Sequence, residues 1–170
     1  MPKGLKQTSE LIAVGFRGTE TAPNTFTQIE IDLNLDPLNQ EVFVVQAVNL
    51  DVTPPDAIAG VDTTTTAALS STSQSAVGTL NNSNVLARLD SNIRAAGFVD
   101  GGVGFLSQSL ETPPAAMEYI NIIATSNFFV QVAGTANLVG KTVSGKLYGY
   151  RARADASIYA ALVQSEVLSN

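Results

Sequence analysis

The sequence predicts an all-β fold, an antiparallel β-sandwich of eight or nine strands. Three observations predict it. Apolar and polar residues alternate with a period of two along most of the 170 residues, as they do in half-buried strands. Turns rich in proline, glycine and asparagine separate these runs. No long helical pattern lies between the runs, which disfavours a parallel α/β fold and favours a sandwich or a barrel.

Nine segments carry the strand pattern. In residues 29–35 every odd position is apolar and every even position is polar, and the turn Asp36–Asn39 follows. Residues 41–53 are apolar on both faces in their first half and alternate in their second half, which predicts a long strand that is central at one end only. Pro54 and Pro55 end it. The expected strands span residues 10–17, 25–35, 41–53, 63–74, 85–95, 105–110, 116–125, 128–134 and 141–153.

Three segments allow two interpretations each. Residues 63–75 are rich in Ser and Thr, which fits either a flexible linker or an exposed strand, and we favour the strand. Residues 85–95 place Val85, Leu89 and Ile93 on one face of a helix, but the strand pattern accounts for every charged position and is preferred. The tail 155–170 fits a short amphipathic helix that Asp155 caps, or a final strand.

The domain organisation follows from these segments. A single sandwich domain is expected to span residues 1–170, with an N-terminal arm at 1–9 and the C-terminal tail at 155–170. Residues 97–104 hold four glycines and are expected to form a loop or tight bend. Ser126 and Asn127 are expected to connect the runs 117–125 and 128–133 as a two-residue hairpin.

The composition excludes most catalytic chemistry. The chain has no His and no Cys, so it holds no Ser-His-Asp triad, thiolate zinc site, disulfide or cysteine nucleophile. It also has no Trp, and aromatic residues make up 6%, which disfavours a carbohydrate-hydrolysing cleft built on two carboxylates. We therefore predict that the protein is not an enzyme, with no catalytic residue, no cofactor and no metal.

Two short motifs imitate binding sites. Asp32–Asp36 resembles the start of an EF-hand loop, but Pro37 stands where glycine is needed and Phe43 where the last glutamate is needed. The run Asp100–Gly104 is glycine-rich, yet it lacks the lysine and hydroxyl residue of a phosphate-binding loop. An alternating strand and a β-bend explain the two motifs better than a ligand does.

Charge is sparse and uneven. Charged residues make up 14% of the chain and the net charge is −6, which disfavours binding to phosphate backbones. No Lys or Arg lies between Gly18 and Ala87, although eight acidic residues do. Four of the nine cations lie in residues 141–153, which contain no acid. Either solvated strand faces happen to differ in sign, or neighbouring copies of the chain carry complementary charges.

Tyr148, Tyr150, Arg151 and Arg153 form a cluster of aromatic and cationic residues. Such residues stack on single-stranded nucleic acid. The acidic chain instead favours a strand whose rings pack on one face and whose arginines pair with acids across strands, with protein contact as the function of the cluster. The candidate residues of an assembly interface are therefore Arg88, Arg94, Tyr148, Tyr150, Arg151 and Arg153.

Targeting signals were sought at the amino terminus and along the chain. The first six residues carry two lysines with no apolar segment behind them, so a secretory signal is not expected. No apolar run has the roughly 18 residues that a transmembrane helix needs. Synthesis in the host cytoplasm, without a transmembrane segment, is expected.

Four segments resemble the single jelly-roll capsid and virion proteins of tailless icosahedral viruses of bacteria and archaea, in strand count, size and composition. The segments are VFVVQAVNL (42–50), VLARLDSNI (85–93), MEYINIIA (117–124) and KLYGYR (146–151). The resemblance implies a jelly-roll shell subunit, located in the virion, whose loops and termini join copies of itself and other virion proteins. It supplies no catalytic residues. The chain departs from many RNA-virus shells in having no basic arm, and sequence-specific nucleic-acid binding is not expected.

The residues support the same expectation without the resemblance. A surface with few charges and many Ser, Thr and Ala residues suits close protein contact, because few charges must be desolvated. We expect a viral structural protein, a capsid subunit that self-assembles into a symmetric oligomer. A phage tail, baseplate or decoration protein is an alternative that would form rings, tubes or trimers. A carbohydrate-binding or other ligand-binding β-sandwich module is a further alternative, recognised by an aromatic-lined groove.

Overall fold

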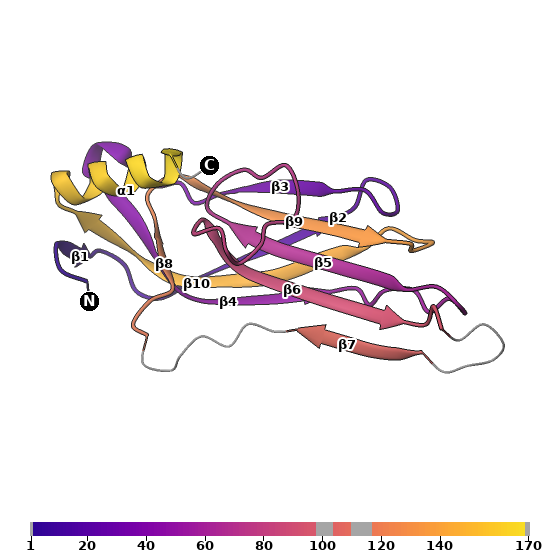
Figure 1. Ribbon diagram of the computed structural model, residues 1–170. Coiled ribbons are helices and arrows are strands. Elements are labelled where there is room, and N and C mark those ends of the chain that lie inside the picture. Colours follow the sequence, from indigo (N-terminus) through magenta and orange to yellow (C-terminus); the bar gives the residue numbers. More distant parts are fainter. Residues whose placement is uncertain (1, 98–103, 110–116, 169–170) are drawn as a thin grey trace.

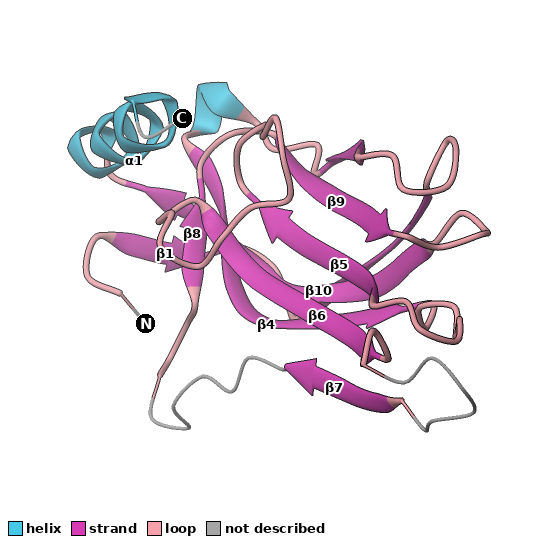
Figure 2. Ribbon diagram, turned by 45° about the vertical axis from the view of Figure 1, so that its right-hand side comes forward, coloured by secondary structure: helices cyan, strands magenta, loops and turns pink. Residues whose placement is uncertain are grey.

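A computed structural model describes residues 2–97, 104–109 and 117–168, and within them it confirms an antiparallel β-sandwich (Figures 1 and 2). These residues form ten strands, one short 3-10 helix (η1) and one α-helix. The elements are β1 (Leu5–Gln7), β2 (Ile12–Thr19), β3 (Thr27–Asp32), η1 (Pro37–Asn39), β4 (Glu41–Val52), β5 (Thr63–Ser70), β6 (Val85–Arg94), β7 (Phe105–Ser109), β8 (Asn121–Ile123), β9 (Asn127–Thr135), β10 (Thr142–Ala154) and α1 (Ala156–Leu168).

Two five-stranded sheets make up the sandwich. The first sheet has the order β1-β10-β4-β8. Strand β2 pairs with the same edge of β10 as β1: β1 pairs with residues 152–154 and β2 with residues 142–149. The second sheet has the order β3-β9-β5-β6-β7. Every strand pair is antiparallel. Such sheets arise from hairpin-like connections, which the many short turns of this sequence supply.

The connectivity is that of a jelly roll. The strand pairs β2·β10, β3·β9, β4·β8 and β5·β6 are the pairs that a single long antiparallel hairpin would form. Rolling that hairpin into two layers adds the pairs β10·β4 and β9·β5, both of which are present. Eight strands therefore form two interlocked Greek keys, and β1 and β7 extend the two sheets at one edge each.

The main hydrophobic core lies between the two sheets. Its fully buried side chains include Phe43, Leu69, Leu89, Phe128 and Leu147. Each of the two sheets contributes apolar residues at alternate positions, so the period-two pattern of the sequence becomes one shared layer. The Phe16 and Phe128 rings meet edge to face across the layer, with centroids 5.8 Å apart.

A β-bulge divides β4 into two halves, and these halves have the two burial patterns that the sequence predicts for residues 41–53. The pairing with β10 shifts between Tyr148 and Gly149, where Gln46 is the extra residue on β4. Before the bulge, Val42 and Val44 face outward and are still buried. After it, Val48 and Leu50 face the main core while the outward residues are exposed. Gly149 permits the close approach of β10 to β4 at the bulge, because a Cβ there would collide with the Val44 carbonyl oxygen.

Helix α1 covers the outward apolar residues of the first half of β4. Ile158, Tyr159, Leu162 and Val163 pack on a second cluster. That cluster consists of Leu5, Val42, Val44, Ala124, Tyr150, Ala152 and Ala154. The helical interpretation of the C-terminal tail is therefore correct, and the helix begins after Asp155, whose carbonyl accepts the Tyr159 N–H at 2.8 Å. Figure 1 shows α1 at one end of the roll, with η1 beside it.

Several details differ from the sequence prediction. Ser126 and Asn127 do not close a hairpin, because β8 pairs with β4 in one sheet and β9 with β3 and β5 in the other. The connection crosses from one sheet to the other. A crossing buries the apolar residues of β8 and β9 as well as a hairpin would, so their pattern does not distinguish the two. The expected strand 116–125 is a strand only at 121–123. Part of the N-terminal arm, Leu5–Gln7, pairs with β10.

The strand interpretation of residues 63–74 and 85–95 is confirmed, with β5 ending at Ser70 and β6 at Arg94. A register shift in the β5·β6 pair moves Val85 to the opposite face from Leu89, against Gly78. The sequence pattern had placed Val85 and Leu89 on the same face. Most of the predicted glycine bend, residues 98–103, lies outside the described residues.

Candidate assembly surfaces

The end of the roll opposite α1 is formed by three connections, 20–26, 53–62 and 136–141, which we call the loop end (Figure 1). These segments lack repetitive backbone hydrogen bonds, so buried side chains must supply the missing partners. Two of the side chains are charged and almost fully buried, Glu20 and Lys141. Charged residues are rarely buried unless they are paired, so each indicates a local structural task.

Asp56 fixes the turn between β9 and β10. One carboxylate oxygen, Oδ1, accepts a hydrogen bond from Lys141 Nζ at 2.7 Å. The other, Oδ2, accepts from the backbone N–H groups of Leu138 at 2.8 Å and Val139 at 3.1 Å. The Lys141 ammonium and these N–H groups hold the pKa of Asp56 below its ordinary value. The 53–62 connection and the β9–β10 turn are thus tied together by one carboxylate.

Glu20 and Asn137 complete the network. The Glu20 carboxylate accepts the N–H groups of Gly134 at 2.6 Å and Lys141 at 2.7 Å. The Asn137 side chain accepts from the Asp56 N–H and donates to the Thr64 carbonyl. Asn24 exchanges two hydrogen bonds with the Asn137 backbone. All three connections are therefore cross-linked by short polar side chains.

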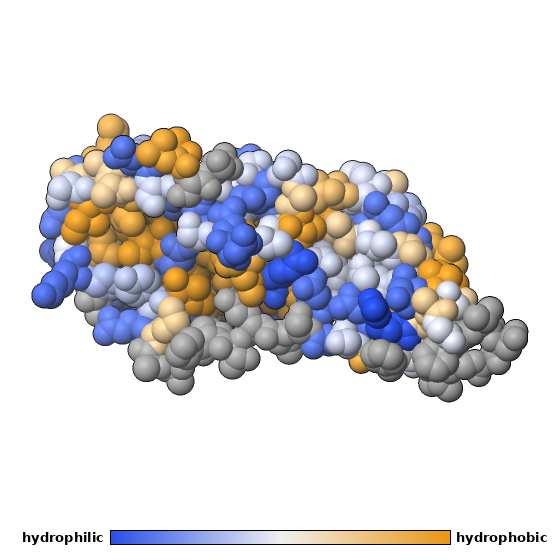
Figure 3. Space-filling model, viewed as in Figure 1, coloured by the Kyte–Doolittle hydropathy of each residue, from blue (hydrophilic) through white to orange (hydrophobic). Residues whose placement is uncertain are grey.

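The network leaves two apolar side chains in water. Leu138 is 74% exposed and Val139 is 62% exposed, although their backbone N–H groups are both bonded to Asp56. We call this pair the apolar tip. In Figure 3, apolar residues gather on the visible face at the α1 end and at the opposite end, where Figure 1 places the β9–β10 turn. A fixed backbone that presents apolar side chains is typical of a contact surface.

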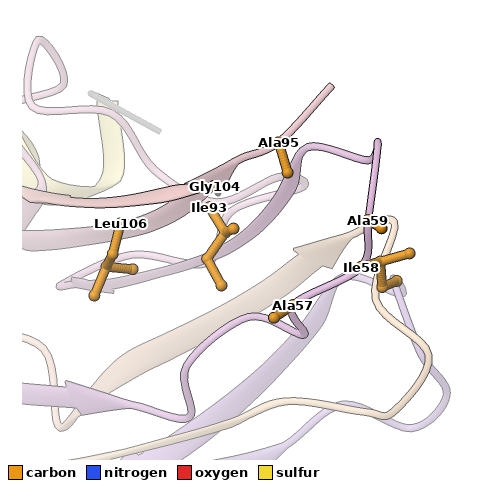
Figure 4. A pocket seen from close by; sticks show the side chains of 7 residues that line it. All are labelled: Ala57, Ile58, Ala59, Ile93, Ala95, Gly104 and Leu106. Atoms are coloured by element: carbon orange, nitrogen blue, oxygen red, sulfur yellow. The ribbon is translucent and has the colours of Figure 1, made fainter. Parts of the chain in front are cut away.

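An apolar pocket begins one residue after Asp56, the residue that holds the backbone of the tip (Figure 4). Its volume is about 340 Å³, and aliphatic side chains and a glycine line it. The lining residues are Ala57, Ile58, Ala59, Ile93, Ala95, Gly104 and Leu106. One wall is the 53–62 connection. The other wall lies on the inner face of β6 and β7, and the Ile93 and Leu106 side chains of that face point toward the 53–62 connection in the figure.

Asp62 holds the two walls of this pocket together. Its Oδ1 accepts the N–H groups of Ala95 at 2.7 Å and Ala96 at 2.8 Å. These bonds, with a weaker contribution from Arg94, hold the pKa of Asp62 below its ordinary value. The pocket and the tip are therefore both anchored on carboxylates of the 53–62 connection.

Of the predicted interface residues, Arg88 and Arg94 lie on β6 in the second sheet. Arg88 pairs with Asp90 and donates to the Gly78 carbonyl at 2.8 Å, which holds the long β5–β6 connection on the outer face of that sheet. Arg94 reaches Asp62 at 3.6 Å and stays mostly exposed. Both guanidinium groups thus have tasks within the chain.

The other four predicted interface residues lie on β10 in the first sheet, so the six do not form one patch. Tyr150 is 7% exposed within the cluster under α1, and burial raises its pKa. Arg151 pairs with Glu41 at 3.2 Å and donates to the Leu33 and Asn34 carbonyls. Tyr148 is half-buried and Arg153 is exposed. Of the four, Arg153 and Tyr148 are the ones that remain at least partly on the surface.

The acidic and basic stretches of the sequence meet inside the chain. Asp56 and Glu41 belong to the acidic stretch, and their partners Lys141 and Arg151 belong to the basic one. The pairing of β10 with β4 brings the two stretches together. This intramolecular pairing is distinct from solvated faces and from contacts between copies. The Arg151–Glu41 pair is the cross-strand pairing expected for the arginines of this strand, whereas nothing in the sequence pattern indicated the Lys141–Asp56 pair.

The acids of the EF-hand-like motif serve turns. Asp32 accepts the Asn34 N–H at 2.7 Å, and Asp36 caps η1 by accepting the Leu38 N–H. Among the described residues, no group of three or more acidic residues is arranged to hold a metal ion. No helix within residues 2–97, 104–109 and 117–168 is long and apolar enough to cross a membrane.

The loop end was not predictable from the charge and aromatic patterns of the sequence. One feature of the sequence could have indicated it: in residues 136–140 (ANLVG), the large apolar residues Leu138 and Val139 stand inside a turn between strands. Lys141 and Glu20 gave no signal, because their partners lie far away in the sequence. Comparisons of the chain with protein-family models, with curated proteins and with solved structures found no match.

Proposed function

We propose that the protein is a structural subunit of a viral capsid, which assembles with copies of itself through its loops and termini. The observation that carries the proposal is the jelly-roll connectivity combined with a loop end that is locked by buried polar groups and presents apolar side chains. A preorganised contact surface loses little conformational entropy on association.

The surface composition also supports assembly. Charged residues make up 14% of the sequence, and at least four of the nine cations are paired within the described chain. Burying the remaining surface against another copy therefore desolvates few free charges. The resemblance to single jelly-roll shell proteins of tailless icosahedral viruses points the same way, and it places the protein in the virion after synthesis in the host cytoplasm.

The carbohydrate-binding alternative gains less support. The described pocket at the loop end is lined by aliphatic residues and glycine, whereas sugar rings bind on aromatic platforms beside polar groups. Contact with another apolar surface suits this lining better.

Electron microscopy of the purified protein, combined with light scattering over a range of concentrations, tests the proposal. We expect closed particles or ring-shaped oligomers that convert into them. Tubes or trimers would favour the tail, baseplate or decoration alternative. A strictly monomeric protein at the highest attainable concentration would overturn the proposal.

A further inference from the structure

The apolar tip and the apolar pocket form one rigid unit. Asp56 fixes the backbone of the tip, and the next three residues of the chain, 57–59, form one wall of the pocket. Asp62 then fixes the opposite wall through Ala95. The relative position of the tip and the pocket is therefore set by the seven residues 56–62, which have a carboxylate anchor at each end.

The tip and the pocket are similar in chemistry, since both are aliphatic. The tip presents two aliphatic side chains, and the pocket offers about 340 Å³ lined by aliphatic side chains and glycine. That volume is at the low end of the roughly 300–1,000 Å³ of ligand pockets. In the single chain Leu138 and Val139 are 74% and 62% exposed, and the pocket residues Ala57, Ala59 and Leu106 are exposed as well. The tip does not fill the pocket of its own chain.

A tip and a pocket at different places on one surface make a heterologous contact. When the rotation between neighbours closes, such a contact generates a ring of copies. Both surfaces lie at the loop end, so a ring built this way gathers the loop ends around its axis.

We propose that Leu138 and Val139 of one copy insert into the pocket of the next copy around a rotation axis. This inference rests on the proposed function, because it names the contact through which the subunits assemble. The locked backbone explains why Glu20, Lys141 and Asn137 are buried at this end, since a mobile tip would lose more entropy on insertion.

Cysteine cross-linking tests the contact directly, because the natural chain has no cysteine. The variants Val139→Cys and Ala59→Cys are purified separately, mixed in equal amounts, assembled and oxidised. Each variant alone lacks the second thiol, so a disulfide between positions 139 and 59 joins two copies. We expect this disulfide to be the main cross-link, identified by mass spectrometry of the linked peptides. The matched control mixes Leu38→Cys with Ala59→Cys, since Leu38 is 91% exposed at the other end of the roll.

A second experiment measures the energetic contribution of the tip. The double variant Leu138→Ser, Val139→Ser is expected to raise the concentration needed for assembly at least tenfold, about 1.4 kcal/mol per contact. Its thermal unfolding should match that of the natural chain, because both side chains are exposed. The control Leu80→Ser, which removes a 55% exposed leucine of the β5–β6 connection, should assemble normally.

The outcomes separate this inference from the proposed function. Particles without a cross-link between positions 139 and 59, or particles that form equally well from the double variant, overturn the inference and leave the capsid proposal intact. A cross-link in the control mixture as strong as in the test mixture also overturns the inference. A natural chain that never assembles and forms no cross-link overturns both.

Discussion

At the loop end, the connections between strands are held by short polar side chains, above all Glu20, Asp56 and Lys141. At the helix end, which comprises α1, β1, β8 and the start of β4, they are held mainly by apolar packing. Polar contacts lie there too: Arg151 pairs with Glu41 at the start of β4 and donates to the Leu33 and Asn34 carbonyls, and a second polar group is Glu166. It is buried in α1, and its carboxylate accepts the N–H groups of Ala124 and Thr125, each at 3.0 Å.

The difference separates two ways of holding a connection between strands. Hydrogen bonds to fixed carboxylates define a backbone geometry without covering it, so the apolar tip stays in water. Apolar packing stabilises a segment only by covering it, so α1 removes the outward side chains of β4 from water. The loop end is therefore suited to contact with a partner, whereas the helix end completes the fold of the chain itself.

The largest expected effect tests the polar network. Glu20→Ala leaves two buried backbone N–H groups without an acceptor, at about 1–3 kcal/mol each. We expect the free energy of unfolding to fall by about 2–6 kcal/mol, measured by denaturant titration. Glu20→Gln keeps one acceptor oxygen and should lose about half as much. The control Glu10→Ala, at an exposed position, should change stability by less than about 0.5 kcal/mol. Equal values for positions 20 and 10 would refute a structural role for the network.

The helix end is tested by Leu162→Ala. Leu162 is partly buried against the cluster under α1, so the loss should be about 1–2 kcal/mol, below the 2–5 kcal/mol of a fully buried leucine. Hydrogen exchange should show faster exchange throughout α1 and unchanged exchange at Leu138 and Val139. The matched control Leu168→Ala lies in the same helix at an exposed position. Faster exchange at the loop end would mean that the two ends are not independent.

The two ends should respond to pH with opposite sign. Burial raises the pKa of Glu166 above its ordinary 4.5, so the folded chain binds this proton more readily than the unfolded chain. Its stabilising contribution is present below pH 4.5 and is lost as the pH rises through the raised pKa. Asp56 has a lowered pKa, so its contribution is present above pH 3.8 and is lost as the pH falls through that lowered value.

Unfolding titrations from about pH 3 to about pH 7 measure both effects. Glu166→Gln should reduce the decline in stability on the neutral side, and Asp56→Asn should reduce the decline on the acid side, to which Asp62 also contributes. If both variants changed the pH profile in the same direction, the proposed contrast between the ends would be wrong.

The smallest expected effect concerns backbone strain at the loop end. Ala136 has a φ of 57°, a left-handed conformation that glycine adopts more easily. Ala136→Gly should therefore stabilise the chain by about 0.5–1 kcal/mol, because the relief of strain exceeds the added entropy of the unfolded chain. Thermal unfolding measures it. Ala133→Gly, at an ordinary strand position of β9, is the control and should destabilise the chain.

Much of the fold was predictable, because burial follows local patterns. The alternation in residues 29–35 and the two-sided apolar start of residues 41–53 correctly indicated a half-buried strand and a partly central one. The crossing at Ser126 was not predictable, since both a hairpin and a crossing bury the same apolar residues. The extra residue Gln46 and the reversal of Val85 arise from register, which depends on the partner strand.

The candidate site was less predictable than the fold. The sequence predicted arginines and tyrosines as interface residues, yet Tyr150 is buried, and Arg88 and Arg151 bond within the chain. The pocket joins residues 57–59 with Ile93, Ala95, Gly104 and Leu106, which become their neighbours only after β6 and β7 have formed. Contacts between such distant segments leave no periodic signal.

By itself the sequence determined the fold class, the positions of most strands and the chemistry that the chain lacks, because these depend on residue type and short-range periodicity. The tertiary structure alone decided the roll of the two sheets, the partners of the buried charges, and the placing of the tip and the pocket at the same end of the roll. These features depend on which distant strands become neighbours, and the free energy of that choice is shared by the whole core.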